Sequence, residues 1–257
     1  MSGCSWLPGQ NVQRIDQRLV EYAWTPRDAS SPTVVFENGL DGTMASWTKV
    51  IPAVSKDAAT FAYNRPGYAR SDPVTTPRDG QHVIDELRAL LASVGARPPY
   101  VLVGHSLGGL YMQLYARRYP DDVAALVLVD STHPDQFRGA GAVEHWPAWF
   151  AWGFRMYLSM AARAEWDAIN ATGEEVLALP SVSGKPVIVL SALQPMQESS
   201  DLANDANAKR RDLARLYPGA RQVWVDSGHD IPIQRPQAVV AAIRQVLPGP
   251  ASTPVAP

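Results

Sequence analysis

The sequence is poor in several features that would assign it to a class at once. Its 257 residues include one cysteine, Cys4, so no disulfide can form within the chain and the redox compartment stays open. The formal net charge is −2, which gives no sign of nucleic acid or an anionic membrane surface as a partner. No run of about 20 apolar residues occurs, so the sequence predicts no transmembrane segment. With 46% hydrophobic residues, the chain has the length and composition for one large α/β domain with a deep core.

The first residues leave one membrane question open. Ser2, Gly3 and Cys4 are typical of the end of a bacterial lipoprotein signal, in which a small residue and Gly precede a lipidated Cys. The apolar stretch that precedes such an ending is not part of this sequence. The other interpretation is a short flexible N-terminus with an incidental cysteine. The localisation therefore stays open between the cytoplasm and the bacterial cell envelope or secretion, with a lipid anchor at Cys4 as one alternative.

The most informative segment lies near the middle of the chain. An apolar, β-branched run, Val101–Val103, leads into a Gly-x-Ser-x-Gly pattern centred on Ser106, and apolar residues at helical spacing follow from Leu110. A strand, a sharp turn with serine at its apex and a helix form a nucleophile elbow. Its strained turn needs small neighbours, which Gly104 and Gly108 supply. A tight turn that merely contains a serine is the other interpretation, but the flanking strand and helix favour catalysis.

Strands and helices alternate along most of the remaining chain. The predicted strands are Asn11–Val20 and Glu21–Trp24 at the sheet edge, then Thr33–Phe36, Thr60–Tyr63, Val101–Val103, Val123–Val129, Pro186–Leu190 and Arg221–Val225. The predicted helices are Met44–Ser55, Asp79–Val94, Leu110–Tyr119, Leu202–Leu216 and Pro236–Leu247. This rhythm predicts an α/β fold, with a mostly parallel sheet flanked by helices.

Residues 133–183 break the alternation. This segment lies between two predicted strands and is far longer than a normal connection. It is rich in aromatic residues: Trp146, Trp149, Phe150, Trp152, Phe154, Tyr157 and Trp166. We therefore expect a helical cap over 133–183, a core formed by 1–132 and 184–247, and a disordered tail over 248–257. Within the cap, Trp146, Trp149, Trp152 and Phe154 are predicted to bind substrate, although packing onto the core would also explain such residues.

Four stretches together carry a resemblance to a known family: Phe36–Trp47, Tyr63–Asp72, Gly104–Gly109 and Ser227–Pro232. They are similar to the oxyanion loop, the loop after the fourth strand, the elbow and the Gly-His segment of the α/β-hydrolases. From about residue 30 to residue 247, the chain resembles the serine esterase and lipase-like branch of that family. The resemblance implies the α/β-hydrolase fold, with the predicted cap inserted after the strand that ends at Val129.

A serine hydroxyl needs an adjacent base to take its proton. Of five histidines, His229 follows the last predicted strand, and in a parallel sheet this loop opens on the same edge as the elbow. The resemblance also implies a base that comes last in the chain. His105 is expected to be structural, because it neighbours the nucleophile on the same turn and points elsewhere. His133 and His145 lie in or beside the predicted cap, where they could touch substrate.

The third member of a triad is an acid that bonds the histidine and balances the imidazolium. In many family members it follows the strand after the cap, but here Gln194 or a neighbour holds that position. The next acids, Glu198 and Asp201, come late and are expected to start a helix. The alternative is Asp130, directly after a buried strand, where some branches of the family place their acid. A turn-forming Asp is the competing interpretation, and we predict Asp130 as the catalytic acid.

The oxyanion hole needs two N–H donors. The N–H of Leu107 follows the nucleophile, and the family loop implies the N–H of Leu40 as the second donor. Asn38 stands where the family commonly has His, and its side chain can still brace the loop by hydrogen bonds. Glu37 and Asp41 lie close to this site, with Arg65 as a candidate partner for them.

The predicted function is a serine hydrolase that cleaves small hydrophobic carboxylic esters through an acyl-enzyme, without metal or cofactor. A serine nucleophile argues against the family's dehalogenases and epoxide hydrolases, which use Asp. Peptidases, lactonases, C–C bond hydrolases and perhydrolases with the same serine remain open. A non-catalytic small-molecule receptor on the same fold is the alternative from another class, and it would bind an ester with little or no turnover.

Overall fold

A computed structural model of the protein describes residues 7–15, 17–28, 31–193 and 200–247. Cys4, Gln194, Glu198 and the predicted tail over 248–257 therefore lie outside the described residues. Among the residues that are described, no helix is both long and apolar enough to cross a membrane.

Eight strands form one sheet, in the order β1-β2-β4-β3-β5-β6-β7-β8. Their bounds are β1 Gln10–Ile15, β2 Arg18–Thr25, β3 Thr33–Glu37, β4 Ala59–Tyr63, β5 Tyr100–His105, β6 Val123–Val129, β7 Val187–Ala192 and β8 Arg221–Val225. β1 and β2 form an antiparallel hairpin, and β2 also pairs antiparallel with β4. The neighbouring strands from β4 through β3 to β8 pair in parallel.

The first predicted strand, Asn11–Val20, differs from the structure, because the chain reverses between Ile15 and Arg18. Gln17, in that reversal, has φ +67°, in the left-handed region that turns use. The two parts of the predicted strand therefore lie opposite each other, with Ile15 paired to Arg18.

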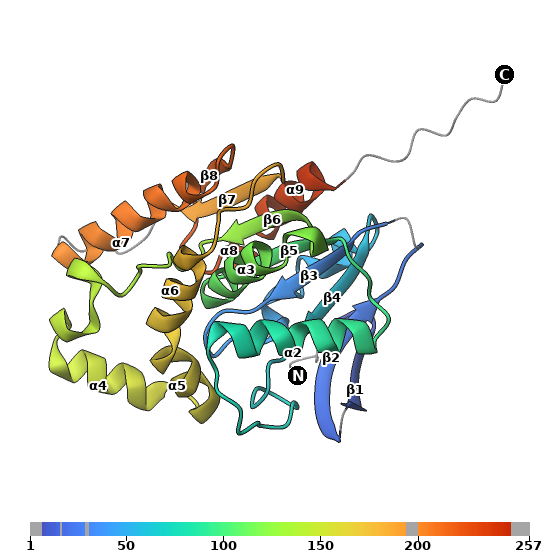
Figure 1. Ribbon diagram of the computed structural model, residues 1–257, viewed down its shortest axis with the longest axis horizontal. Coiled ribbons are helices and arrows are strands. Elements are labelled where there is room, and N and C mark those ends of the chain that lie inside the picture. Colours follow the sequence, from blue (N-terminus) through green and yellow to red (C-terminus); the bar gives the residue numbers. More distant parts are fainter. Residues whose placement is uncertain (1–6, 16, 29–30, 194–199, 248–257) are drawn as a thin grey trace.

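Helices cover both faces of the sheet (Figure 1). One apolar core joins the sheet to α2 Gly80–Ser93 and α3 Leu107–Arg118, and a second joins it to α1 Ile51–Val54 and α9 Pro236–Val246. Side chains alternate along each strand, so Leu102 of β5 enters the first core and its neighbours Val101 and Val103 enter the second. This arrangement confirms the predicted α/β fold class, a mostly parallel sheet flanked by helices.

Two further helices lie in the C-terminal part of the chain. They are α7 Asp201–Asp212, with the 3₁₀ turn Leu213–Leu216 after it, and α8 Ile231–Gln234, after β8. Ser200 caps α7 by accepting a hydrogen bond from the N–H of Ala203, at 3.1 Å. Asp201, one of the late acids, is thus the first residue of this helix, as its sequence context predicted.

The segment between β6 and β7 is helical. After two 3₁₀ turns it forms α4 Ala148–Tyr157, α5 Met160–Asp167 and α6 Ile169–Ala178. Figure 1 shows α4 and α5 beyond the edge of the sheet, with α6 leading back toward α3. Thr172 of α6 anchors this return, because its Oγ1 accepts the N–H of Gly80 at 2.9 Å. The segment is therefore attached to the helices on one face of the sheet.

Candidate active site

Ser106 lies at the sharp turn between β5 and α3. Its backbone angles, φ +53° and ψ −124°, are strained for a residue with a side chain. The turn holds together because its flanks are glycine. A Cβ at Gly104 would lie 2.5 Å from the carbonyl oxygen of Gly108, and one at Gly108 would lie 2.4 Å from that of Asn38. No larger residue fits at either position without moving backbone, so the predicted elbow geometry is present.

The structure brings Ser106, His229 and Asp130 together. Nε2 of His229 lies 2.9 Å from Oγ of Ser106, and its Nδ1 lies 2.6 Å from Oδ2 of Asp130. The three residues follow β5, β8 and β6, whose carboxyl ends meet at one edge of the sheet. The His229 side chain is 49% exposed and that of Asp130 is 1% exposed. The imidazole therefore joins a hydroxyl at the surface to a buried carboxylate.

The carboxylate of Asp130 is held by four donors. Oδ1 accepts the backbone N–H of Ala192 at 3.0 Å and Nε of Arg210 at 3.0 Å. Oδ2 accepts Nη2 of Arg210 at 3.3 Å, besides Nδ1 of His229. Burial raises the pKa of Asp130, but the hydrogen bond and charge of His229 and the charge of Arg210 outweigh it and hold the pKa well below its usual range. The acid is thus ionised and fixed in orientation. Arg210, on α7, has no sequence signal that ties it to Asp130.

His105 contacts both the backbone and the ring of His229. Its Nε2 lies 2.9 Å from the carbonyl oxygen of His229, and the two rings are 4.7 Å apart. Burial, and to a smaller extent the neighbouring His229, lower the pKa of His105 to about 4, so the ring is neutral at pH 7 and donates from Nε2. His133 lies elsewhere, with Nε2 3.3 Å from Oδ2 of Asp212, and His145 lies exposed in a 3₁₀ turn.

The loop after β3 runs beside the elbow. Asn38 braces it as predicted: Nδ2 donates to the carbonyl of Tyr63 at 2.7 Å, and Oδ1 accepts Nε1 of Trp47 at 2.9 Å. A Cβ placed on Gly39 would lie 3.2 Å from Cβ of Ser106, so the backbone that leads into Leu40 passes directly against the serine. Leu107, the other predicted donor, is the first residue of α3. N–H groups of a first helical turn have no partner within the helix.

A buried network of charged residues lies next to this loop. The sequence did not show that this network extends to α5. Arg65 pairs with Glu37 at 2.6 Å and with Glu165 of α5 at 2.8 Å, and all three side chains are at most 1% exposed. Burial raises the pKa of Glu37, while the charge of Arg65 opposes this rise. Glu165 is 100 residues from Arg65 in the sequence, so no local pattern could have joined them.

The four predicted substrate residues divide into two pairs. Trp149 and Trp152 project from α4 and are 75% and 69% exposed. Trp146 and Phe154 are half-buried in a ring cluster with Trp166, with centroids 5.8 and 4.9 Å from its indole. Phe154 also packs on a small apolar cluster that Leu40 joins. Binding of substrate by these residues stays a prediction.

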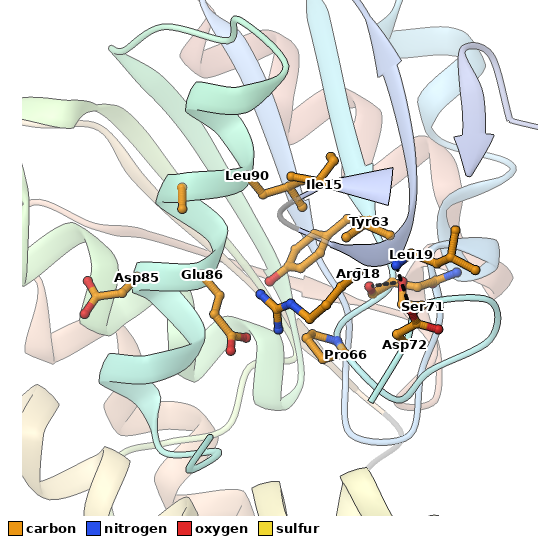
Figure 2. Close-up of a pocket in the computed structure, with 13 residues that line it drawn as sticks. Ile15, Arg18, Leu19, Tyr63, Pro66, Ser71, Asp72, Asp85, Glu86 and Leu90 are labelled. Carbon is orange, nitrogen blue, oxygen red and sulfur yellow. Dashed lines mark hydrogen bonds between the residues drawn. The ribbon is translucent and has the colours of Figure 1, made fainter. Parts of the chain in front are cut away.

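A hollow of about 280 Å³ lies apart from this site, between the β1–β2 hairpin and α2 (Figure 2). Apolar side chains such as Ile15, Leu19 and Leu90 form much of its wall, with Asp85 and Glu86 on the α2 side. The residues that line it do not include the Ser106, His229 and Asp130 group. This hollow is therefore separate from the candidate active site.

Comparison with known proteins shows where the chain belongs. A family model described as the alpha/beta hydrolase fold matches residues 32–165, just over half of the chain. The bifunctional esterase/perhydrolase DCH of Acinetobacter calcoaceticus is 33% identical over 113 residues, covering 43% of this chain and 40% of that protein. The (lyso)-N-acylphosphatidylethanolamine lipase of Mus musculus is 28% identical over 127 residues, covering 48% of this chain and 35% of that protein.

The chain spans less than half the length of the curated relatives that it matches. Likeness in structure extends further. The enol-lactonase of Burkholderia xenovorans LB400 superposes with a TM-score of 0.64 at 18% identity, over 92% of this chain and 99% of that one. At that identity the likeness shows the fold alone. The family match and the sheet, helices and elbow described above agree, and the chain belongs to the alpha/beta hydrolase family.

Proposed function

We propose that the protein is a serine hydrolase that cleaves carboxylic esters through Ser106, His229 and Asp130. One observation carries the proposal: the unbroken hydrogen-bonded chain from the Ser106 hydroxyl, 2.9 Å to His229, and from His229, 2.6 Å to Asp130. Both distances are those of a serine nucleophile with its base and of a base with the acid that orients it. The esterase and lipase names of two relatives support ester bonds as the substrate class.

The proposed reaction has two halves. Oγ of Ser106 attacks the acyl carbon while Nε2 of His229 takes the hydroxyl proton, and the imidazolium that forms is balanced by Asp130. The oxyanion accepts hydrogen bonds from the N–H groups of Leu40 and Leu107. When the tetrahedral intermediate collapses, the C–O bond to the alcohol breaks and His229 returns its proton to the leaving oxygen. Water then attacks the acyl-enzyme with the same base, which releases the acid and restores Ser106.

The test is turnover of short-chain chromogenic esters by the wild type and by Ser106→Ala. We expect Ser106→Ala to lose at least about 10³-fold in kcat with its thermal unfolding unchanged, because a small residue suits the elbow. Ser55→Ala, at a half-buried serine at the end of α1, is the matched control and should keep wild-type activity. A phosphonate inhibitor should add to Ser106, as seen by peptide mass spectrometry. Binding of the ester without repeated turnover would instead favour a receptor.

A further inference from the structure

Every donor of the Arg65 guanidinium is used. Nε and Nη2 each donate at 2.8 Å to Glu165, one to Oε1 and the other to Oε2. Nη1 donates to Oε1 of Glu37 at 2.6 Å and to the carbonyl of Asn38 at 2.7 Å. Nη2 also donates to the carbonyl of Gly39 at 2.7 Å. These are all five N–H bonds that a guanidinium has, so Arg65 is fixed on all sides.

Two of these acceptors are backbone carbonyls that immediately precede Leu40. In a trans peptide the C=O of one residue and the N–H of the next point in opposite directions. Because the Gly39 carbonyl is drawn to Arg65, and also accepts the N–H of Gly42 at 3.2 Å, the N–H of Leu40 points away from Arg65. Gly39 itself lies against Ser106 on this loop.

From this geometry we propose that Arg65 is a positioning residue for the oxyanion hole, which sets the Leu40 N–H toward the acyl oxygen on Ser106. The proposal rests on the proposed function of Ser106 as nucleophile. Arg65 does not touch substrate in it; it acts through the Asn38 and Gly39 carbonyls. A preorganised N–H of this kind stabilises the oxyanion and is matched to the transition state rather than to the bound ester.

Glu165 connects the α5 helix to Arg65 and so to the same loop. Its carboxylate accepts two bonds from Arg65 and one from the Tyr68 hydroxyl, at 2.7 Å. The Tyr68 hydroxyl in turn lies 3.4 Å from the N–H of Asp41, on the far side of Leu40. The oxyanion loop is thus held at both ends by groups that converge on one side chain of α5. A lysine at position 65 would keep the charge but has three donors on one nitrogen and cannot span these acceptors.

The experiment compares Arg65→Lys with Arg117→Lys. Arg117 is also buried and donates to backbone carbonyls, those of Val176 and Leu179, but it lies at the other end of α3 from Ser106. Turnover is measured per active site counted with a phosphonate, and an alkyl boronic acid serves as a transition-state analogue. We expect Arg65→Lys to lower kcat by about 10–100-fold with KM changed less than about threefold, and to weaken boronate binding by a similar factor. Arg117→Lys should keep kcat within about threefold.

Equal losses of kcat in the two variants, or a loss for Arg65→Lys that falls wholly in KM, would overturn the positioning role. If Arg65→Lys does not fold, Glu165→Gln takes its place, because the amide keeps one acceptor for Arg65 and we expect about a 3–10-fold loss in kcat and boronate affinity. A wild type that binds the boronate but turns over no ester would contradict the proposed function alone. Unchanged boronate binding in the Arg65 and Glu165 variants of an active esterase would contradict this inference alone.

Discussion

At the scale of single residues, Asp130 of the candidate site has unusual surroundings. Asp130 follows β6 with φ +37°, a left-handed conformation in which its side chain is turned toward His229. The tight turn leaves the carboxylate against the N–H of Ala192, at the end of the neighbouring strand β7. Asp130 is therefore a turn residue whose carboxylate also faces His229, and its role as the catalytic acid stays a prediction.

Asp130→Asn should lower kcat by about 10⁴-fold, because an amide in place of the carboxylate favours the wrong tautomer of His229 and does not balance its charge. Asp201→Asn, at the start of α7, is the matched control and should change kcat little. The measurement is kcat of both variants and the wild type in steady-state kinetics on a short-chain ester. A larger loss for Asp201→Asn would place the acid in the later loop.

His105 gives a pH dependence to stability. Because burial lowers its pKa in the folded protein to about 4, the unfolded chain binds a proton at higher pH than the folded one does. The neutral His105 ring makes its full contribution to the free energy of unfolding above about pH 6.5. This contribution is lost as the pH falls toward 4. It amounts to at most about 3 kcal/mol.

We therefore expect His105→Gln to flatten the change in free energy of unfolding between pH 7 and pH 4.5, measured by urea denaturation. Glutamine keeps a donor for the His229 carbonyl but does not titrate. His145→Gln, an exposed change, should leave the wild-type slope. The same slope in all three proteins would show that His105 does not titrate differently on folding.

At the scale of helices and strands, the Met44–Ser55 segment shows why a predicted element divides. The structure has a 3₁₀ turn, Met44–Trp47, and a separate short helix, Ile51–Val54. Pro52 has no N–H to continue a helix from the first turn, but it is tolerated in the first turn of a new one. The apolar spacing alone does not show this break.

The start of α2 depends on a residue 92 positions away. Thr172→Val keeps the shape of the side chain but removes the oxygen that accepts the buried N–H of Gly80. An unsatisfied buried donor costs about 1–3 kcal/mol. We expect a lower free energy of unfolding by that amount in urea denaturation, with little change in ester kcat. Thr48→Val, whose hydroxyl bonds only its own exposed turn, is the matched control and should change stability by less than about 0.5 kcal/mol.

The aromatic residues of α4 allow a test of substrate selection. Phe154 shares a cluster with Leu40, whereas Tyr157, at the end of α4, is largely exposed and is not one of the predicted substrate residues. We expect Phe154→Ala to shift the acyl length at which kcat/KM is greatest, since each methylene buried contributes about 0.8 kcal/mol. Tyr157→Ala should leave that optimum in place. An identical profile of kcat/KM from acetyl to long acyl esters in the wild type and both variants would mean that α4 does not select the acyl chain.

At the scale of the whole molecule, the fold was predictable because its signals are local. The predicted strands Val123–Val129 and Arg221–Val225 agree with the structure residue for residue. The first is an apolar run that fits a strand covered on both faces of the sheet, whereas the second is a partly exposed strand at the sheet edge. The elbow around Ser106 follows from glycine spacing. Arg210 and Glu165 could not be found in this way, because their partners lie 80 and 100 residues away and no spacing relates them.

The Arg65 network limits which segments can be exchanged between this protein and another hydrolase. Exchange of the segment between β6 and β7 with that of another hydrolase would transplant an aromatic surface but would also remove Glu165. The guanidinium would then stay buried with one of its two carboxylate partners gone, and breaking a buried pair in this way costs about 3–5 kcal/mol. A chimera should therefore retain activity only if the incoming helix carries an acid at the Glu165 position or the core gives up Arg65 in the same step. In this chain, α5 and the loop after β3 can therefore be exchanged only together.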